Sequence, residues 1–384
     1  MVNIERIAKL HAAENPASKV FSAEKVPHSY AAITMEWLTD VLCRHLPRAA
    51  VMDFQLDAPD DGTTNRRRIV LRYNQAGQEG GCPSSVFCKA ASSLSNRLLN
   101  AMTDIGRIET DFYRWARPRL DIDAPEALYA RHDPETCTYI VMLKDLSGVV
   151  RFCDERTDVT FEMAMTQMET LARLHSAFYD DPALGTDALP FPSWEVFWDR
   201  MMKLAPDFPV VCDRAFVESE HLMSTRLFAR REEIWPATVR SMELQRALPR
   251  ALCHGDSHLK NWYVRHDDKM GLGDWQVVTA GPWARDLVYT LTCALSIENR
   301  RRWEKELIRF YLGRMHELGV PLISFDAAML LCRQQIFTPL AFWTNTLIPA
   351  QGMPDMQPRQ TTLEFLRRLF AAIEDHDALD SLQL

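Results

Sequence analysis

The sequence has no long hydrophobic run, no excess of basic residues and little glycine. Its longest apolar stretch, residues 287–297, is interrupted by four hydroxyl-bearing residues and is far shorter than the roughly 20 residues of a membrane span. The 44 Lys and Arg against 52 Asp and Glu give a net charge of −8, which argues against a nucleic-acid or anionic-membrane binder. With 14 Gly and 21 Pro in 384 residues, no low-complexity linker is expected.

The nine cysteines are scattered and include no Cys-x-x-Cys pair. This usage indicates a reduced, cytoplasmic protein and disfavours a structural zinc site. A composition of 47% apolar and 25% charged residues is typical of a globular chain. Because cores usually divide above roughly 250–300 residues, we expect two lobes.

The segments with strand character lie mostly in the first part of the chain. Residues 51–56, 68–73, 85–90 and 138–143 are rich in β-branched and aromatic residues, and helical spacing indicates one long helix over residues 96–116. Beyond Asp145 helical patterns dominate. We therefore predict an α+β protein with a small β-rich lobe over residues 1–143 and a larger helical lobe over residues 144–384. The helices expected in the second lobe are 160–179, 194–204, 214–231, 283–296, 302–318, 325–347 and 363–376.

The richest chemistry lies in residues 252–276. Residues 262–265 and 271–274 are predicted to form a hairpin that places Trp262 opposite Asp274, so that Asn261 and Asp274 meet at its open end. An Asn carbonyl and a carboxylate are hard oxygen ligands suited to Mg²⁺. Asp256, five residues before Asn261, adds a second carboxylate. One carboxylate for a nucleophile and two oxygen ligands for Mg²⁺ are what phosphoryl transfer requires.

These residues also carry a family resemblance. His254-Gly255-Asp256-x-His258-x-x-Asn261 followed by Asp274 resembles the signature of the aminoglycoside phosphotransferase and choline kinase superfamily. The run 274–276, Asp-Trp-Gln, most resembles its ecdysteroid-kinase-like branch. The resemblance spans about residues 30–350 and implies a two-lobed, protein-kinase-like fold that binds ATP, or alternatively GTP, with Mg²⁺. It implies that Asp256 is the catalytic residue and that Asn261 and Asp274 hold the metal.

A kinase-like site also needs a strand lysine for the α/β-phosphates and a helix glutamate that holds it. Lys89 is the one charged residue in the strand-like run 85–90. At 100° per residue, Glu109 lies on the inward stripe with Ile105 and Phe112, whereas Asp111 points away. We therefore expect Lys89 to pair with Glu109.

Two further nucleotide contacts follow from the resemblance. The loop Gly62-Thr63-Thr64 corresponds to the family's glycine-bearing loop, whose backbone amides would cover phosphates; the alternative is a simple hairpin turn. Met142 and Lys144 lie where the hinge belongs, and their backbone would hydrogen-bond the purine.

Several buried-type residues have expected structural roles. Asp286 is expected to cap a helix and brace the catalytic loop, His175 to be structural, and His254 to brace its own loop. For His258 two roles stay open, a bond to a backbone carbonyl or a phosphate contact. Acidic residues near the C-terminus would form either an acidic rim or only a solvated end: Glu364, Glu374, Asp375, Asp377 and Asp380.

The predicted function is ATP-dependent, Mg²⁺-assisted phosphorylation of a hydroxyl group on a small molecule, by a monomer or homodimer. The aromatic run 337–343 favours an apolar or mixed hydroxylated acceptor. The alternatives are a catalytically silent nucleotide-binding protein of the kinase fold and a true aminoglycoside-modifying enzyme. A metallophosphoesterase is disfavoured because Asp256-x-His258 is not followed by the Gly-Asn-His that such enzymes require.

Overall fold

The computed structural model describes residues 4–350 and 356–382. Contacts divide the chain into two compact units, residues 1–118 with 125–148 and residues 119–124 with 149–384. Within the described residues, no helix combines the length and the apolarity that crossing a membrane requires. The predicted boundary at residue 143 thus lies five residues before the observed division, and a six-residue segment of the first part belongs with the second unit.

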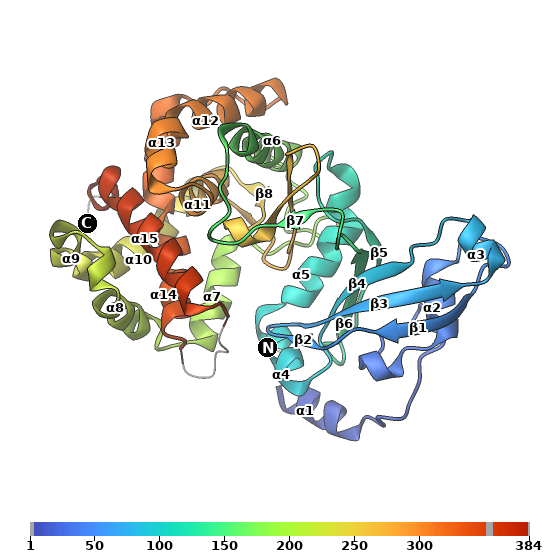
Figure 1. Ribbon diagram of the computed structural model, residues 1–384. Coiled ribbons are helices and arrows are strands. Elements are labelled where there is room, and N and C mark those ends of the chain that lie inside the picture. The colour runs from blue at the N-terminus through green and yellow to red at the C-terminus, as the bar shows by residue number, and fades with distance from the viewer. Residues whose placement is uncertain (1–3, 351–355, 383–384) are drawn as a thin grey trace. The chain divides into compact units, whose positions relative to one another are not determined.

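The first unit is built on one antiparallel sheet with strand order β1-β3-β4-β6-β5, and β2 pairs with the end of β3. Its side chains pack against helix α2 around Trp37, Ile69, Val86 and Met142. Helix α5 packs on β5 and β6 (Figure 1). The elements are α1 Ile4–Ala13, α2 Met35–Leu42, β1 Val51–Leu56, β2 Asp60–Asp61, β3 Asn65–Tyr73, α3 Gln75–Glu79, β4 Ser85–Ala90, α4 Leu94–Thr103, α5 Ile105–Asp111, a π-helical turn Phe112–Ala116, β5 Ala127–His132 and β6 Tyr139–Lys144.

The single helix predicted over residues 96–116 is wrong, because the chain breaks at Asp104. Asp104 has a φ of 71°, in the left-handed region, and separates α4 from α5. The break is held by Asn100, whose Oδ1 accepts a hydrogen bond of 2.7 Å from the amide of Gly106. A side chain at Gly106 would collide with the ring of Tyr139 on β6, so the break lets α5 approach the sheet closely.

The second unit is mainly helical and surrounds two small sheets, β10-β9-β7 and β11-β8. Helix α11 is buried along its whole length and packs against α6, α13, α15 and β8 (Figure 1). The elements are β7 Arg151–Phe152, α6 Phe161–Ala177, α7 Trp194–Leu204, α8 Phe208–Glu218, α9 Thr225–Ala229, α10 Ile234–Leu244, β8 Ala251–Cys253, η7 Leu259–Asn261, β9 Trp262–Val264, β10 Met270–Leu272, β11 Thr279–Gly281, α11 Trp283–Ala294, α12 Ile297–Glu317, α13 Phe325–Gln335, α14 Phe337–Leu347 and α15 Arg359–Asp375.

Two predicted helices of this unit are each divided in two. The segment 214–231 breaks after α8, and Ser224 starts α9 by accepting a hydrogen bond from the amide of Leu227. The segment 325–347 breaks at Ile336, since Pro339 has no amide hydrogen to continue the helical bonding. Strand β5 and helix α10 were not predicted at all.

Candidate active site

In the first unit, Lys89 of β4 and Glu109 of α5 form a buried ion pair. Lys89 Nζ lies 2.7 Å from Glu109 Oε1, and their side chains are 6% and 0% exposed. Asp111 instead pairs with Arg107 at 2.7 Å. The predicted choice of Glu109 over Asp111 is therefore confirmed, while the phosphate contact of Lys89 stays a prediction.

The loop Gly62–Thr64 joins β2 to β3 and is tied to helix α4. Asn96 Nδ2 donates to the carbonyls of Gly62 and Thr63, both at 2.8 Å, and the amide of Gly62 donates to the carbonyl of Thr64 at 3.0 Å. The hairpin turn that the sequence left open is thus present. Within it the Gly62 amide is engaged by the turn itself, so a phosphate contact through that amide would require the turn to rearrange.

Met142 and Lys144, the residues predicted to form the hinge, both lie within strand β6. Met142 is fully buried in the middle of β6, flanked by Cys88 of β4 and Tyr129 of β5, so its backbone lies inside the sheet. β6 extends through Lys144, whose amide donates to the carbonyl of Glu126 at 2.9 Å. A backbone contact from Met142 to a purine therefore has no support, because the sheet ends only after Lys144.

In the second unit, the candidate catalytic loop leaves β8 through a sharp turn at Gly255. Gly255 has a φ of 83°, and a side chain there would collide with the backbone of Val277. His254 bonds to the carbonyl of Gly273 through Nε2 at 2.8 Å and accepts the amide of Asp256 at Nδ1 at 3.2 Å. His254 thus braces its loop, as predicted. Burial lowers its pKa, so the ring is neutral, and its proton lies on Nε2.

The carboxylate of Asp256 lies at the end of this turn among hydrogen-bond donors. Its Oδ1 accepts from the Tyr289 hydroxyl at 3.0 Å, and its Oδ2 lies 3.4 Å from both Asn261 Nδ2 and His258 Nε2. Burial opposes ionisation, but the nearby His258 and the Tyr289 hydroxyl outweigh it and lower the pKa of Asp256 to about 2. Asp256 is therefore a carboxylate at every physiological pH.

The hairpin that follows has a register different from the predicted one. Trp262 lies opposite Leu272, not Asp274, because Arg265 pairs with Lys269 and the turn closes on Asp268, whose φ is 58°. The partner of Trp262 is thus two residues earlier in the chain than predicted, so the connection between the strands is shorter. Asn261 still lies beside the end of β10, since its carbonyl accepts the amide of Gly273 at 2.8 Å.

Asp274 directly follows Gly273 and has a φ of 59°, a backbone conformation that Asp tolerates better than most residues. Asn261 and Asp274 were expected near the same end of the hairpin because Trp262 would pair with Asp274. That pairing is absent, but Asp274 still follows the residue that bonds to the Asn261 carbonyl. The Nδ2 atom of Asn261 donates to the carbonyl of Asp256 at 2.7 Å. This bond orients the amide and leaves its Oδ1 as the atom that would ligate a cation.

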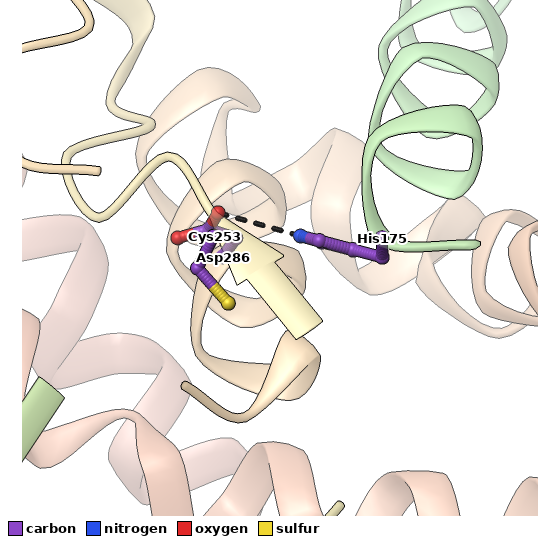
Figure 2. Close-up of side chains that lie close together, drawn as sticks. All are labelled: His175, Cys253 and Asp286. Carbon is purple, nitrogen blue, oxygen red and sulfur yellow. Dashed lines mark hydrogen bonds and ion pairs between the residues drawn. The ribbon is translucent and has the colours of Figure 1, made fainter. Parts of the chain in front are cut away.

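Asp286 braces the loop from helix α11, but it does not cap that helix. Its two oxygens accept the amides of His254 at 2.5 Å and Gly255 at 3.0 Å, while Pro282 is the capping position. Figure 2 shows His175 directed at Asp286, with Nε2 3.4 Å from the carboxylate. Burial opposes ionisation of Asp286, but its bond to His175 and the charge of Arg285 lower its pKa overall.

His175, Cys253 and Asp286 are also the one group of three metal-type ligands found among the described residues (Figure 2). The donor set does not fit a metal. Both Asp286 oxygens are used by backbone amides, His175 Nδ1 bonds to the Tyr311 hydroxyl at 2.7 Å, and burial raises the pKa of the Cys253 thiol. The cluster is therefore a buried support of the catalytic loop, as predicted for His175.

Sequence reasoning missed Tyr289 and Arg285 as parts of the site. Arg285 Nη1 donates to the carbonyl of Gly255 at 2.5 Å, and its guanidinium lies 3.7 Å from the centre of the Trp194 ring. The two residues lie on the same helix as Asp286, at positions one before and three after it. Helical spacing from Asp286 was the signal that would have found Tyr289.

The site can now be compared with known proteins. A model of the ecdysteroid kinase-like family matches residues 195–320, a span that includes the catalytic loop, the hairpin and all of α12. The predicted resemblance to that branch is confirmed over these residues, and the structure confirms an α+β chain that divides into two compact units. No curated protein sequence matches the chain.

Three similar solved structures are named as two phosphotransferases and one kinase. An aminoglycoside phosphotransferase of Streptomyces rimosus, in complex with ADP and streptomycin, is 16% identical over 79% of this chain and 90% of its own, with a TM-score of 0.41. An ethanolamine kinase of Plasmodium vivax is 9% identical over 85% and 83%, with a TM-score of 0.47. A macrolide 2'-phosphotransferase of Brachybacterium faecium is 12% identical over 81% and 92%, with a TM-score of 0.45.

Proposed function

We propose that the protein transfers the γ-phosphoryl group of ATP, or alternatively GTP, to a hydroxyl group of a small molecule with the help of Mg²⁺. The observation that supports this most is the arrangement around Asp256. A carboxylate with a pKa of about 2 is held beside an oriented Asn261 amide, in a loop fixed by the buried Asp286. The match to a kinase-like family over the same residues agrees with this function.

The residues present fit a magnesium ion. The amide of Asn261 is oriented by its bond to Asp256, and Asp274 follows the residue that bonds to the Asn261 carbonyl. One amide oxygen and one carboxylate, without thiolate or imidazole, are the ligands that Mg²⁺ prefers. Bound by Asn261 and Asp274, the ion would neutralise charge on the nucleotide phosphates.

Asp256 acts on the acceptor hydroxyl. It accepts a hydrogen bond from the hydroxyl and orients that oxygen toward the γ-phosphorus. As the new O–P bond forms and the bond to the departing nucleoside diphosphate breaks, the hydroxyl proton passes to Asp256. Because a carboxylate with a pKa of about 2 is a weak base, orientation contributes more than early proton removal.

In the first unit, we assign Lys89 to the α/β-phosphates. Glu109 fixes the ammonium group at 2.7 Å and neutralises it before nucleotide arrives. A lysine buried without such a partner would tend to lose its proton, and with it the charge that binds phosphate.

The aminoglycoside alternative loses its main sequence support. A polycationic substrate requires unpaired carboxylates, but the acidic residues near the C-terminus are bonded within the unit. Asp375 pairs with Arg301 at 2.7 Å, and Asp377 with Arg226 at 2.6 Å. The others contact Arg367 and Arg368 (Glu364), Arg230 (Asp380) and the Ser224 hydroxyl (Glu374).

A nucleotide-consumption screen tests the proposal. The purified chain, with Mg²⁺ and ATP or GTP, is offered hydroxylated metabolites and, as a separate set, aminoglycosides. We expect turnover with a neutral or apolar hydroxylated compound and none with aminoglycosides. Thermal stabilisation by Mg-ATP without turnover on any acceptor would instead favour the catalytically silent alternative.

A further inference from the structure

Helix α11 (Trp283–Ala294) holds the catalytic loop at several neighbouring positions. Most of these bonds are buried, and most contact the backbone of the loop. They are Arg285 to the Gly255 carbonyl at 2.5 Å, Asp286 to the amides of His254 and Gly255, Thr290 to the Ser257 carbonyl at 3.2 Å, the Ser257 hydroxyl to the Asp286 carbonyl at 3.1 Å, and Tyr289 to Asp256.

Tyr289 differs from the others, because its hydroxyl reaches the reacting carboxylate itself. It donates to Oδ1 of Asp256 at 3.0 Å, whereas the donors near Oδ2, from Asn261 and His258, lie at 3.4 Å. The two oxygens of Asp256 are therefore not equivalent. Oδ1 has a well-formed hydrogen bond, and Oδ2 has two long contacts.

The burial of Tyr289 maintains this difference between the two oxygens of Asp256. Tyr289 is only 2% exposed, while a third of the Asp256 side chain remains exposed. Burial and the neighbouring Asp256 raise the pKa of Tyr289 well above its usual value, so the phenol stays protonated and remains a donor. The centre of its ring also lies 6.1 Å from that of His258, whose Nε2 approaches Oδ2 of the carboxylate.

We propose, on the basis of the function proposed above, that Tyr289 is a positioning residue that holds Oδ1 of Asp256 and leaves Oδ2 to receive the proton of the acceptor hydroxyl. The acceptor O–H bond breaks, its proton joins Oδ2, the oxygen bonds to the γ-phosphorus and the nucleoside diphosphate leaves. Without the phenol, the carboxylate rotates among orientations of which only some direct an oxygen at the acceptor.

The test compares Tyr289→Phe with a matched control, Tyr263→Phe. The control removes a bond of the same kind in the same unit, since the Tyr263 hydroxyl donates to Oδ1 of Asp123 at 2.5 Å, away from Asp256. We expect kcat to fall about 10- to 100-fold in Tyr289→Phe with KM for the nucleotide within about twofold, because only the reacting geometry changes. Tyr263→Phe should keep kcat within about twofold of the wild type.

Full kcat in Tyr289→Phe, with an active wild type, would overturn the positioning role and leave the proposed function intact. An inactive wild type would remove both. Melting curves by circular dichroism accompany the kinetics. If the loss of turnover reflects unfolding at the assay temperature, Tyr289 acts on stability only, and the inference is wrong.

A double-mutant cycle in unfolding adds a measurement that needs no turnover. The free energies of unfolding of Tyr289→Phe, Asp256→Asn and the double variant are compared with the wild type. We expect Tyr289→Phe to have one effect in the wild-type chain and a different effect in a chain that already carries Asp256→Asn, since the two groups share one hydrogen bond. Strict additivity would contradict the contact on which the inference depends.

Discussion

Lys89 in the first unit and Asp256 in the second are charged side chains that are held in different ways. In the first unit, Lys89 is matched by the opposite charge of Glu109, and both side chains are almost fully buried. In the second unit, Asp256 keeps a third of its side chain exposed and is surrounded by a tyrosine hydroxyl, an asparagine amide and a histidine.

Because of this difference, substitutions in the two environments should affect stability and activity to different extents. Removing one member of a buried ion pair leaves the other as an uncompensated charge, which is strongly destabilising. Removing one neutral donor from a carboxylate that still contacts solvent costs less, because water replaces part of the bond. Substitution of Glu109 should therefore lower the stability of the fold more than substitutions around Asp256 do, and substitutions around Asp256 should act mainly on turnover.

The largest expected effect is on turnover. Asp256→Asn removes the group that orients the acceptor and takes its proton, so kcat should fall by about 10³-fold or more, while Mg-ATP still stabilises the protein. Coupled nucleotide consumption and thermal shift with Mg-ATP measure the two quantities. Asp267→Asn, an exposed acid in the hairpin turn, is the control and should keep full activity. Full activity of Asp256→Asn would refute the mechanism.

The next largest effect is on the stability of the first unit. Glu109→Gln removes the carboxylate that lies 2.7 Å from the buried Lys89 ammonium and should lower the free energy of unfolding by about 3–5 kcal/mol. Asp111→Asn, on the same helix, breaks the more exposed pair with Arg107 and should change it by about 1 kcal/mol or less. Urea denaturation followed by circular dichroism measures both. Equal effects of the two variants would contradict the distinction between them.

The Lys89–Glu109 pair was predictable because it depends on local periodicity. Strand alternation identified Lys89, and the 3.6-residue repeat selected Glu109 over Asp111, so no distant residue was needed. The motif around Asp256 and Asn261 could also be identified from the sequence, because its residue types and their spacing define it.

Two of three features that were predicted wrongly or missed depend on residues distant in sequence, whereas the hairpin register depends on the backbone of its own turn. The break at Asp104 goes together with the close approach of Gly106 to Tyr139, which lies far along the chain, and no local propensity reports that contact. The predicted hairpin register was wrong because Asp268 adopts a left-handed conformation, which makes the turn shorter than expected. Tyr289 was missed because its partner lies on another element, although its helical spacing from Asp286 was visible.

A smaller effect concerns nucleotide binding in the second unit. Asp274→Asn keeps a residue type that tolerates the φ of 59° but removes a charge from the predicted metal site. We expect the apparent affinity for ATP in the presence of Mg²⁺ to fall about tenfold, with little change in EDTA. Thermal shift titrations with and without EDTA measure this. An unchanged Mg²⁺ dependence would refute the ligand role of Asp274.

The smallest effect is a difference in the acid sensitivity of the two units. Asp256 has a pKa of about 2, lowered from 3.8, so the stability it contributes is present above about pH 4 and is lost as the pH falls toward 2. Burial shifts Asp111 in the opposite direction and raises its pKa, despite its bond to Arg107. Its ionisation therefore opposes folding, and protonation on acidification restores stability.

The two acids should consequently respond to substitution with opposite signs. Between about pH 5 and pH 3, Asp256→Asn should lose less stability than the wild type, by on the order of 1 kcal/mol after allowance for the exposed part of the side chain. Asp111→Asn should lose more, because it lacks the stabilising protonation. Urea denaturation at each pH measures the slopes. Parallel slopes for the wild type and both variants would show that neither acid is shifted, and the contrast between the two environments would then not hold.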